Sequence, residues 1–140
     1  MTRIDFYSNA ASRPLVACQL TTKAFAQGLH VLIFAPDDAI ARAIDRQLWT
    51  FQATGFVPHC MAGERLAGET PVLISASIGE AGHDGLLVNL SDACPPLFAR
   101  FRRLIEIVGN DDQDRLAARL RWRFYRERGY EVNHVELGKS

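Results

Sequence analysis

Short apolar runs alternate with helical patterns along this chain, and this alternation constrains the fold more than any other feature. Residues His30–Ala35 form a continuous apolar run of the kind that is buried in a parallel sheet. The strand-like segments lie at 4–7, 30–35, 71–75, 86–90, 103–108 and 130–137. Because helical patterns separate most of them, we predict an α/β fold with a doubly wound, mostly parallel sheet in three layers, α/β/α. The last segment is expected to be an edge strand.

Capping residues and glycines mark the expected helix ends. The first helix is predicted to begin near Ser12 and to end at Gly28. The second begins at 36–38 and has Trp49 near its end. Residues 50–70 show little periodicity, so we expect an irregular segment there.

The third expected helix, 111–128, has an unusual distribution of charge. Aspartates occupy its first turn, where negative charge is favoured, and Gly129 follows as a stop. Its apolar stripe, which we expect to be buried, consists of Leu116, Ala117, Leu120 and Phe124. A neighbouring stripe consists of Arg115, Arg119, Trp122, Arg123 and Arg126. Residues 115–128 contain six arginines and one glutamate, although the formal net charge of the chain is zero.

This basic stripe has two interpretations. A charged helix face is most often simply solvated. However, the basic residues here are all arginine, whose planar fork suits carboxylate or phosphate. Trp122 lies beside them, and tryptophan with arginine is the composition of a binding hot spot.

Length and composition favour one soluble domain. At 140 residues, of which 48% are hydrophobic, the chain is expected to form a single domain over 1–140. No apolar run reaches the roughly 18–20 residues that span a membrane. Residues 1–6 do not have the form of a signal peptide, so we expect a cytoplasmic protein. Zero net charge argues against a bulk nucleic-acid binder.

Motifs for nucleotide binding and catalysis are missing. The expected loop after the first strand, 8–12, contains no glycine, and the chain has neither a G-x-x-x-x-G-K-[ST] nor a G-x-S-x-G motif. His83 and Asp84 lie on a glycine-rich loop without a nucleophile. We therefore predict a Rossmann-like sheet without a nucleotide-binding loop, no cofactor and no enzymatic activity.

The cysteines and histidines do not have the spacing of a metal site. The chain contains three cysteines and no C-x-x-C motif, and no second pair of ligands accompanies His59 and Cys60. Cys18 falls inside a helical apolar pattern and is expected to lie in the core. We predict no metal site.

Several segments taken in order resemble the chi subunit of bacterial DNA polymerase III. The resemblance covers nearly the whole chain. The segments that carry it are 5–7, 31–33, 35–37, 48–49, 56–59, 62–64, 89–91, 106–109, 121–122, 125–126 and 129–130. It implies a chi-like α/β domain that acts as a non-catalytic accessory protein of the clamp loader.

The resemblance also implies partners and a binding site. In the family, chi binds the psi subunit and the acidic C-terminal tail of single-stranded-DNA-binding protein, which ends in Pro-Phe; contact with DNA is indirect. Matched by position, the tail-binding residues are Trp49, Val108, Arg115, Arg119, Trp122 and Arg123. Arg119 would bind the terminal carboxylate, Trp49, Val108 and Trp122 would wall a pocket for the phenylalanine, and Arg115 and Arg123 would meet upstream acidic residues. Two arginines stand where the family pattern has lysine, and Trp122 stands where it has tyrosine.

Two alternatives remain open at this stage. The resemblance assigns psi binding to Phe56, Val57 and Pro58, but Phe56 and Val57 could equally be core residues. The basic helix Arg115–Arg128 could also bind single-stranded nucleic acid directly.

Overall fold

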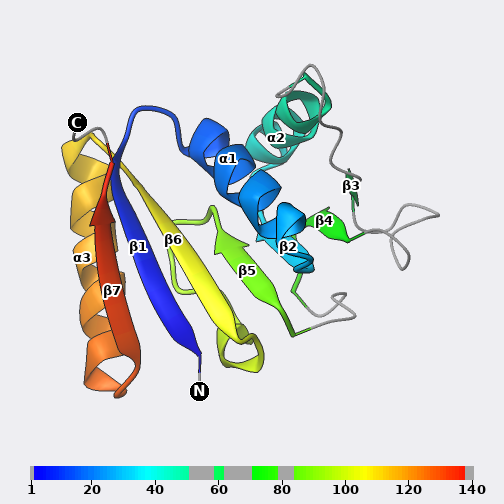
Figure 1. The fold of residues 1–140 in the computed structure, drawn as a ribbon. Helices are drawn as coiled ribbons and strands as arrows, with labels where there is room; N and C mark the ends of the chain where they lie inside the picture. The colour runs from blue at the N-terminus through cyan, green and yellow to red at the C-terminus, as the bar shows by residue number, and fades with distance from the viewer. Residues whose placement is uncertain (1, 51–58, 62–70, 79–83, 138–140) are drawn as a thin grey trace.

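The computed structural model describes residues 2–50, 59–61, 71–78 and 84–137 (Figure 1). Its strands are β1 (Arg3–Ala10), β2 (Val31–Phe34), β3 (His59–Met61), β4 (Val72–Ser75), β5 (Leu86–Asn89), β6 (Arg103–Gly109) and β7 (Glu131–Glu136). Its helices are α1 (Arg13–Ala26), α2 (Asp38–Thr50), the short 3-10 helix η2 (Phe98–Arg100) and α3 (Asp112–Glu127).

The strands form one sheet in the order β3-β4-β2-β5-β6-β1-β7, and every neighbouring pair is parallel. The predicted α/β class is confirmed, and β7 is an edge strand as expected. The opposite edge was not foreseen. Strand β3, His59–Met61, lies in the segment 50–70 that was predicted to be irregular. It was missed because three residues are too few to show an alternating pattern.

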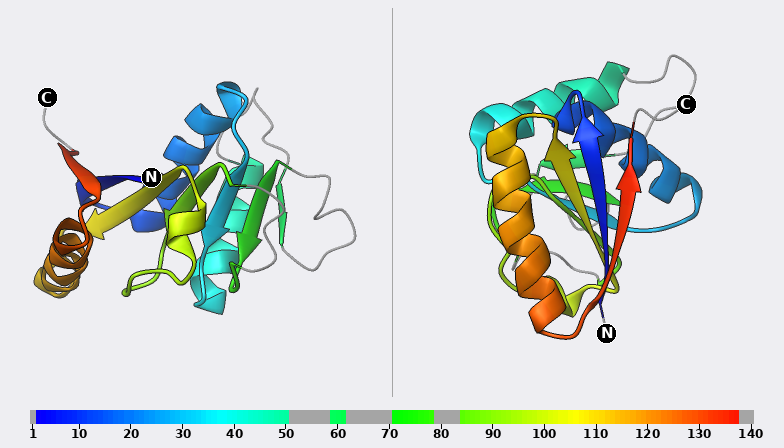
Figure 2. Two further views of the ribbon diagram at one scale, coloured as in Figure 1. Left: turned by 90° about the horizontal axis from the view of Figure 1, so that it is seen from below. Right: turned by 90° about the vertical axis from the view of Figure 1, so that its left-hand side faces the viewer.

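Helices cover both faces of the sheet, which confirms the three predicted layers (Figure 2). On one face, Val31 and Ile33 of β2 belong to a core that α1 and α2 close. On the other face, Leu32 and Phe34 belong to a core that includes residues of α3. Successive residues of a strand point to opposite faces, so a continuous apolar run serves both cores.

The expected helix ends are confirmed. Ser12 caps α1 by accepting a hydrogen bond from the Leu15 amide at 3.3 Å, and Asp111 caps α3 by accepting one from the Asp114 amide at 2.8 Å. Gly28 and Gly129 follow these helices with φ of 81° and 85°, a conformation that glycine adopts without strain.

Cys18 lies in the core, as predicted. Its side chain is fully buried on α1. Burial raises the pKa of its thiol to about 12, because the charged thiolate is poorly solvated there. The thiol therefore stays protonated in the folded protein at neutral pH, and its role is that of a small apolar side chain.

A buried polar cluster joins α3 to the sheet. Glu106 of β6 is fully buried, and Arg121 of α3 donates to its Oε1 at 3.1 Å. The Tyr125 hydroxyl donates to Oε2 at 2.6 Å, and Asn89 donates to both oxygens at 2.9 and 3.0 Å. Burial and the nearby Glu106 carboxylate raise the pKa of Tyr125 above its ordinary value, so the hydroxyl remains a donor. A buried carboxylate is thereby surrounded by donors.

This cluster corrects the prediction for the buried face of α3. The buried residues of α3 are Ala118, Arg121 and Tyr125, whereas Leu116 and Leu120 are 63% and 64% exposed. The predicted apolar stripe is therefore largely on the outside. Arg121 and Tyr125 face inward, where they donate hydrogen bonds to the buried Glu106 carboxylate. Sequence periodicity counts only apolar residues as buried, so it could not identify an arginine as part of the buried face.

Removing Glu106 should destabilise the fold strongly. Glu106→Ala leaves the Arg121 guanidinium buried without its counter-charge, and we expect the free energy of unfolding to fall by about 3–5 kcal/mol. Urea denaturation followed by circular dichroism measures this loss.

Two variants serve as controls for this prediction. Arg119→Ala alters an exposed arginine of the same helix and should change stability by less than about 0.5 kcal/mol. The double variant Glu106→Leu with Arg121→Met should lose less stability than the sum of its single changes, because each single change leaves a buried charge without its partner and the double variant leaves none. A loss below about 1 kcal/mol in Glu106→Ala would contradict the importance of the cluster.

Candidate functional site

A tight turn between β6 and α3 sets the position of the basic helix. The Gly109 amide donates to the Asp114 carboxylate at 3.2 Å. A side chain at Gly109 would collide with that carboxylate, because an added Cβ would lie only 2.4 Å from its Oδ2. The close approach lets α3 begin directly after the strand, so that Val108 at the end of β6 lies beside the first turns of the helix.

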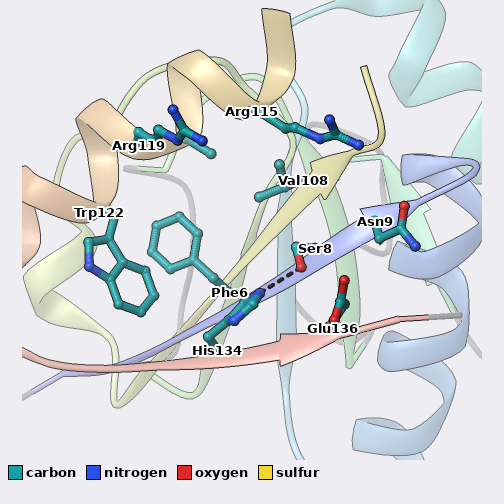
Figure 3. A pocket seen from close by; sticks show the side chains of 10 residues that line it. Phe6, Ser8, Asn9, Val108, Arg115, Arg119, Trp122, His134 and Glu136 are labelled. Carbon is teal, nitrogen blue, oxygen red and sulfur yellow. Dashed lines mark hydrogen bonds between the residues drawn. The ribbon is translucent and has the colours of Figure 1, made fainter. Parts of the chain in front are cut away.

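A surface cavity of about 530 Å³ lies between α3 and the strands β1, β6 and β7 (Figure 3). Its lining residues are Phe6, Ser8, Asn9, Val108, Arg115, Ala118, Arg119, Trp122, His134 and Glu136. Four separate elements supply these side chains. The cavity is within the size range of a small-ligand or peptide side-chain pocket.

The inner wall of the cavity is apolar. Phe6, Val108 and Ala118 are only 3%, 5% and 6% exposed, so their side chains are fixed by packing. Trp122 is half-buried and packs edge-to-face on Phe6, with ring centroids 5.1 Å apart. The His134 ring lies 6.3 Å from Trp122, also edge-to-face. An aromatic or aliphatic group entering this cavity would meet a rigid, partly aromatic surface.

One rim of the cavity is cationic. Arg115 and Arg119 extend over it from successive turns of α3 (Figure 3). Arg115 is 3.4 Å from Asp112, and the Arg115 side chain is 52% exposed. Arg119 is exposed and has no ion-pair partner within the described residues. Guanidinium forks at this rim can bind a carboxylate that lies at the mouth of the cavity.

The opposite rim is polar and comes from β1 and β7. Ser8 Oγ and His134 Nε2 are hydrogen-bonded at 2.6 Å. Asn9 has a left-handed φ of 62° where the register of β1 shifts, and its side-chain amide donates to the Leu137 carbonyl at 3.1 Å. Glu136 adds a carboxylate to this side. The cavity therefore has one strongly basic side and one mixed polar side.

The structure brings most of the predicted tail-binding residues together. Val108, Arg115, Arg119 and Trp122 all line this one cavity. Arg123 is exposed on α3 but is not a lining residue.

Other predicted residues lie outside what the structure describes. Trp49 belongs to α2, which packs with α1, and its side chain is not described. Phe56, Val57 and Pro58 lie outside the described residues, so the structure says nothing about their predicted role in psi binding.

Six of the ten residues that line the cavity, most of them on β1 and β7, were missed from the sequence. Phe6 and Ser8 of β1, and His134 and Glu136 of β7, carry no motif. β7 pairs with β1 in parallel, which sets Ser8 opposite Glu136 and Phe6 opposite His134. A signal existed only in the alternation of residues 4–7 and 130–137, which indicates strands but not that they are neighbours.

A second cavity, of about 320 Å³, lies at the carboxyl ends of β1 and β6, where open α/β sheets commonly bind ligands. Arg13 lines it, but its guanidinium is already used: Nε donates to the Ile107 carbonyl at 3.0 Å and Nη2 to the Ser91 carbonyl at 3.2 Å. The loop that follows β1 at this cavity, residues 11–12, contains no glycine.

The described part of the chain offers no metal-binding group of three or more His, Cys, Asp or Glu side chains. The helices described there are also too short or too polar to cross a membrane.

Comparison with solved structures identifies the fold. The C-terminal domain of S. cerevisiae Dbp5, solved with Gle1 and IP6, superposes on this chain with a TM-score of 0.64. The match covers 99% of this chain and 92% of the solved chain. The two sequences are only 13% identical, so the likeness extends to the Rossmann-like architecture and not to a function.

Comparison with known sequences identifies the family. The chain is similar to DNA polymerase III subunit chi of Pseudomonas aeruginosa, with 38% identity over 98% of both proteins. The Haemophilus influenzae subunit is 32% identical over 88% of this chain and 86% of its own, and that of Escherichia coli is 29% identical over 84% and 81%. The family model described as DNA polymerase III chi subunit, HolC, matches residues 1–133. The chain therefore belongs to the chi subunit family of DNA polymerase III.

Proposed function

We propose that this chi-family protein binds the acidic C-terminal tail of single-stranded-DNA-binding protein and connects it, through the psi subunit, to the clamp loader. It would act as a non-catalytic replication subunit in the cytoplasm. One observation carries the proposal: a single cavity joins an apolar wall of Phe6, Val108 and Trp122 to the guanidinium groups of Arg115 and Arg119. Membership of the chi family supports the role in replication.

The chemistry of the cavity suits a peptide that ends in phenylalanine. The terminal ring would contact Trp122 and Phe6, which favour edge-to-face packing. Its carboxylate would be bound by Arg119, and acidic residues upstream would meet Arg115 and Arg123. Arg123 lies outside the cavity, as an upstream contact requires. The role of Trp49 as a further wall stays a prediction.

The expected affinity is moderate. Each solvent-exposed ion pair contributes roughly 0–1 kcal/mol, whereas one well-packed aromatic anchor contributes about 2 kcal/mol or more. We expect a dissociation constant in the micromolar range, which corresponds to a binding free energy of about −8 kcal/mol. The anchor and its carboxylate therefore decide specificity, and the remaining arginines adjust affinity.

The first test of this proposed function uses the peptide. A fluorescently labelled acidic peptide ending in Asp-Ile-Pro-Phe should bind the full chain with micromolar affinity, measured by fluorescence anisotropy. A peptide lacking the final phenylalanine should bind at least tenfold more weakly, because it loses the ring that enters the cavity. The full-length peptide with an amidated C-terminus should also bind at least tenfold more weakly, because it loses the carboxylate that Arg119 binds. Equal binding of all three would indicate only a non-specific basic surface.

Variants of α3 test the same model from the protein side. Arg119→Ala should weaken binding at least tenfold, because it removes a charge-assisted hydrogen bond of about 1.5–3 kcal/mol. Ala118→Leu should also abolish binding by filling the cavity. Arg126→Ala is the matched control, since Arg126 is exposed on the same helix but does not line the cavity, and it should weaken binding only slightly. Small and equal losses at every arginine would contradict the pocket.

A separate prediction addresses psi. The double variant Phe56→Ala and Val57→Ala should lose co-elution with psi in size-exclusion chromatography, because it removes the apolar side chains assigned to that contact. It should keep its affinity for the acidic peptide and its melting temperature. A large drop in melting temperature would instead show that Phe56 and Val57 are core residues.

Direct binding of single-stranded DNA is the second candidate function. Arg119, Arg123 and Arg126 favour it, because all three are exposed and none has an ion-pair partner within the described residues. Binding of this kind would occur without any other protein and would weaken steeply with salt, by about 0.7 log units per phosphate contact for each log unit of salt concentration. Titration of a labelled oligonucleotide at several salt concentrations distinguishes the two functions.

A further inference from the structure

The outer surface of α3 carries an apolar ridge, which we define as Leu116, Leu120 and Phe124. Leu116 and Leu120 are 63% and 64% exposed, more than any other large apolar side chain in the described residues. Phe124 is half-buried, and its ring packs near Phe98. The three are spaced four residues apart, so they form one line along the helix axis.

Leu116 and Leu120 of the ridge have no part in fixing α3 to the sheet, whereas Phe124 packs against the core on that face. Ala118, Arg121 and Tyr125 form the buried face, and they point to the opposite side of the helix from Leu116 and Leu120. Single exposed leucines are common on protein surfaces. Two leucines in one row that continues into an aromatic ring make a contiguous apolar strip, and such strips mark surfaces that contact partners.

Arginines lie along one side of the ridge and at its C-terminal end. Arg119 and Arg123 follow Leu116 and Leu120 on the side that leads to the cavity, and neither has an ion-pair partner in the described residues. At the far end, the Arg128 guanidinium lies over the Phe124 ring, 4.3 Å from its centroid. An apolar row with cationic edges is complementary to an apolar row with anionic edges.

Two other occupants fit this surface less well. A second copy of the chain would set two arginine-rich helices against each other, and like charges at close range are unfavourable. A membrane-surface helix needs a broad apolar face that enters the headgroup region, whereas this ridge presents two leucines and a half-buried ring. A straight row with four-residue spacing matches the side-chain rows of another helix.

We propose that the apolar ridge of α3 binds an acidic amphipathic helix of a partner protein. The partner helix would lie along α3, with its apolar row on Leu116 and Leu120 and its carboxylates facing Arg119 and Arg123. This surface shares Arg119 and Arg123 with the proposed tail-binding site, but its apolar contact is separate from the cavity, which lies on the other side of the Arg119 row. The ridge also does not depend on the proposed function, since it requires neither a terminal phenylalanine nor a free carboxylate.

The test uses the full chain, labelled with ¹⁵N, and a synthetic helical peptide. The peptide is about five helical turns long, with leucines on one face of the helix and glutamates on its other faces. We expect it to shift amide resonances of residues 113–127. The variant Leu116→Gln with Leu120→Gln should weaken its binding at least tenfold, with an unchanged melting temperature, because both side chains are exposed. Leu15→Gln, an exposed leucine on α1, is the matched control and should leave binding unchanged.

Several outcomes would overturn the proposal. One is equal binding of a peptide with the same composition whose leucines are scattered around the helix. Another is a dimer, detected by sedimentation, that dissociates in the double variant, since the ridge would then bind a second copy. A third is ridge-dependent binding to phosphatidylserine vesicles without binding of the peptide. The double variant should keep its affinity for the Asp-Ile-Pro-Phe peptide, so that failure of the ridge and failure of the cavity are distinguished.

Discussion

The ion pair between Glu106 and Arg121 sets the rotation of α3, and the surfaces of that helix depend on it. Arg121 donates to Glu106 at 3.1 Å and Tyr125 donates to the same carboxylate at 2.6 Å, so both positions must face β6. Successive residues of an α-helix are 100° apart, and fixing two of them fixes all the others. Arg115, Arg119 and Trp122 are thereby turned toward β1 and β7, and Leu116 and Leu120 are turned outward.

A competing rotation of α3 shows why the ion pair is decisive. Turning Leu116 and Leu120 inward would gain roughly 1.5–3 kcal/mol for each buried side chain. It would also leave Glu106 buried without Arg121 and Tyr125, its donors on α3, at a cost of about 3–5 kcal/mol, and would expose Tyr125 and Ala118. A buried ion pair does not by itself show that a protein is more stable than it would be with apolar residues in its place. Here the pair selects between two packings that hydrophobic burial by itself would not separate clearly.

The sequence predicted what depends on local patterns and failed where distant residues meet. Capping at Ser12 and Gly129 and the alternating order of strands and helices are local features, and the structure confirms them. The rotation of α3 depends on Glu106, which lies on another element, so an arginine in a helix could not be recognised as buried. The resemblance to the chi family supplied the α3 side of the cavity. Its other side, with Phe6 and His134, requires the pairing of β1 with β7, which joins opposite ends of the chain.

The distribution of charge would let a neutral protein select the acidic partners proposed for it. The chain has 16 basic and 16 acidic residues, yet α3 concentrates exposed arginines on one side of the molecule. A local positive field attracts anions to that surface, while zero net charge limits general attraction to nucleic acid. Charge alone does not distinguish one acidic chain from another. The apolar cavity and the apolar ridge lie on either side of the same arginine row, so in the proposed complexes the shape of the apolar contact would decide which acidic segment binds at each.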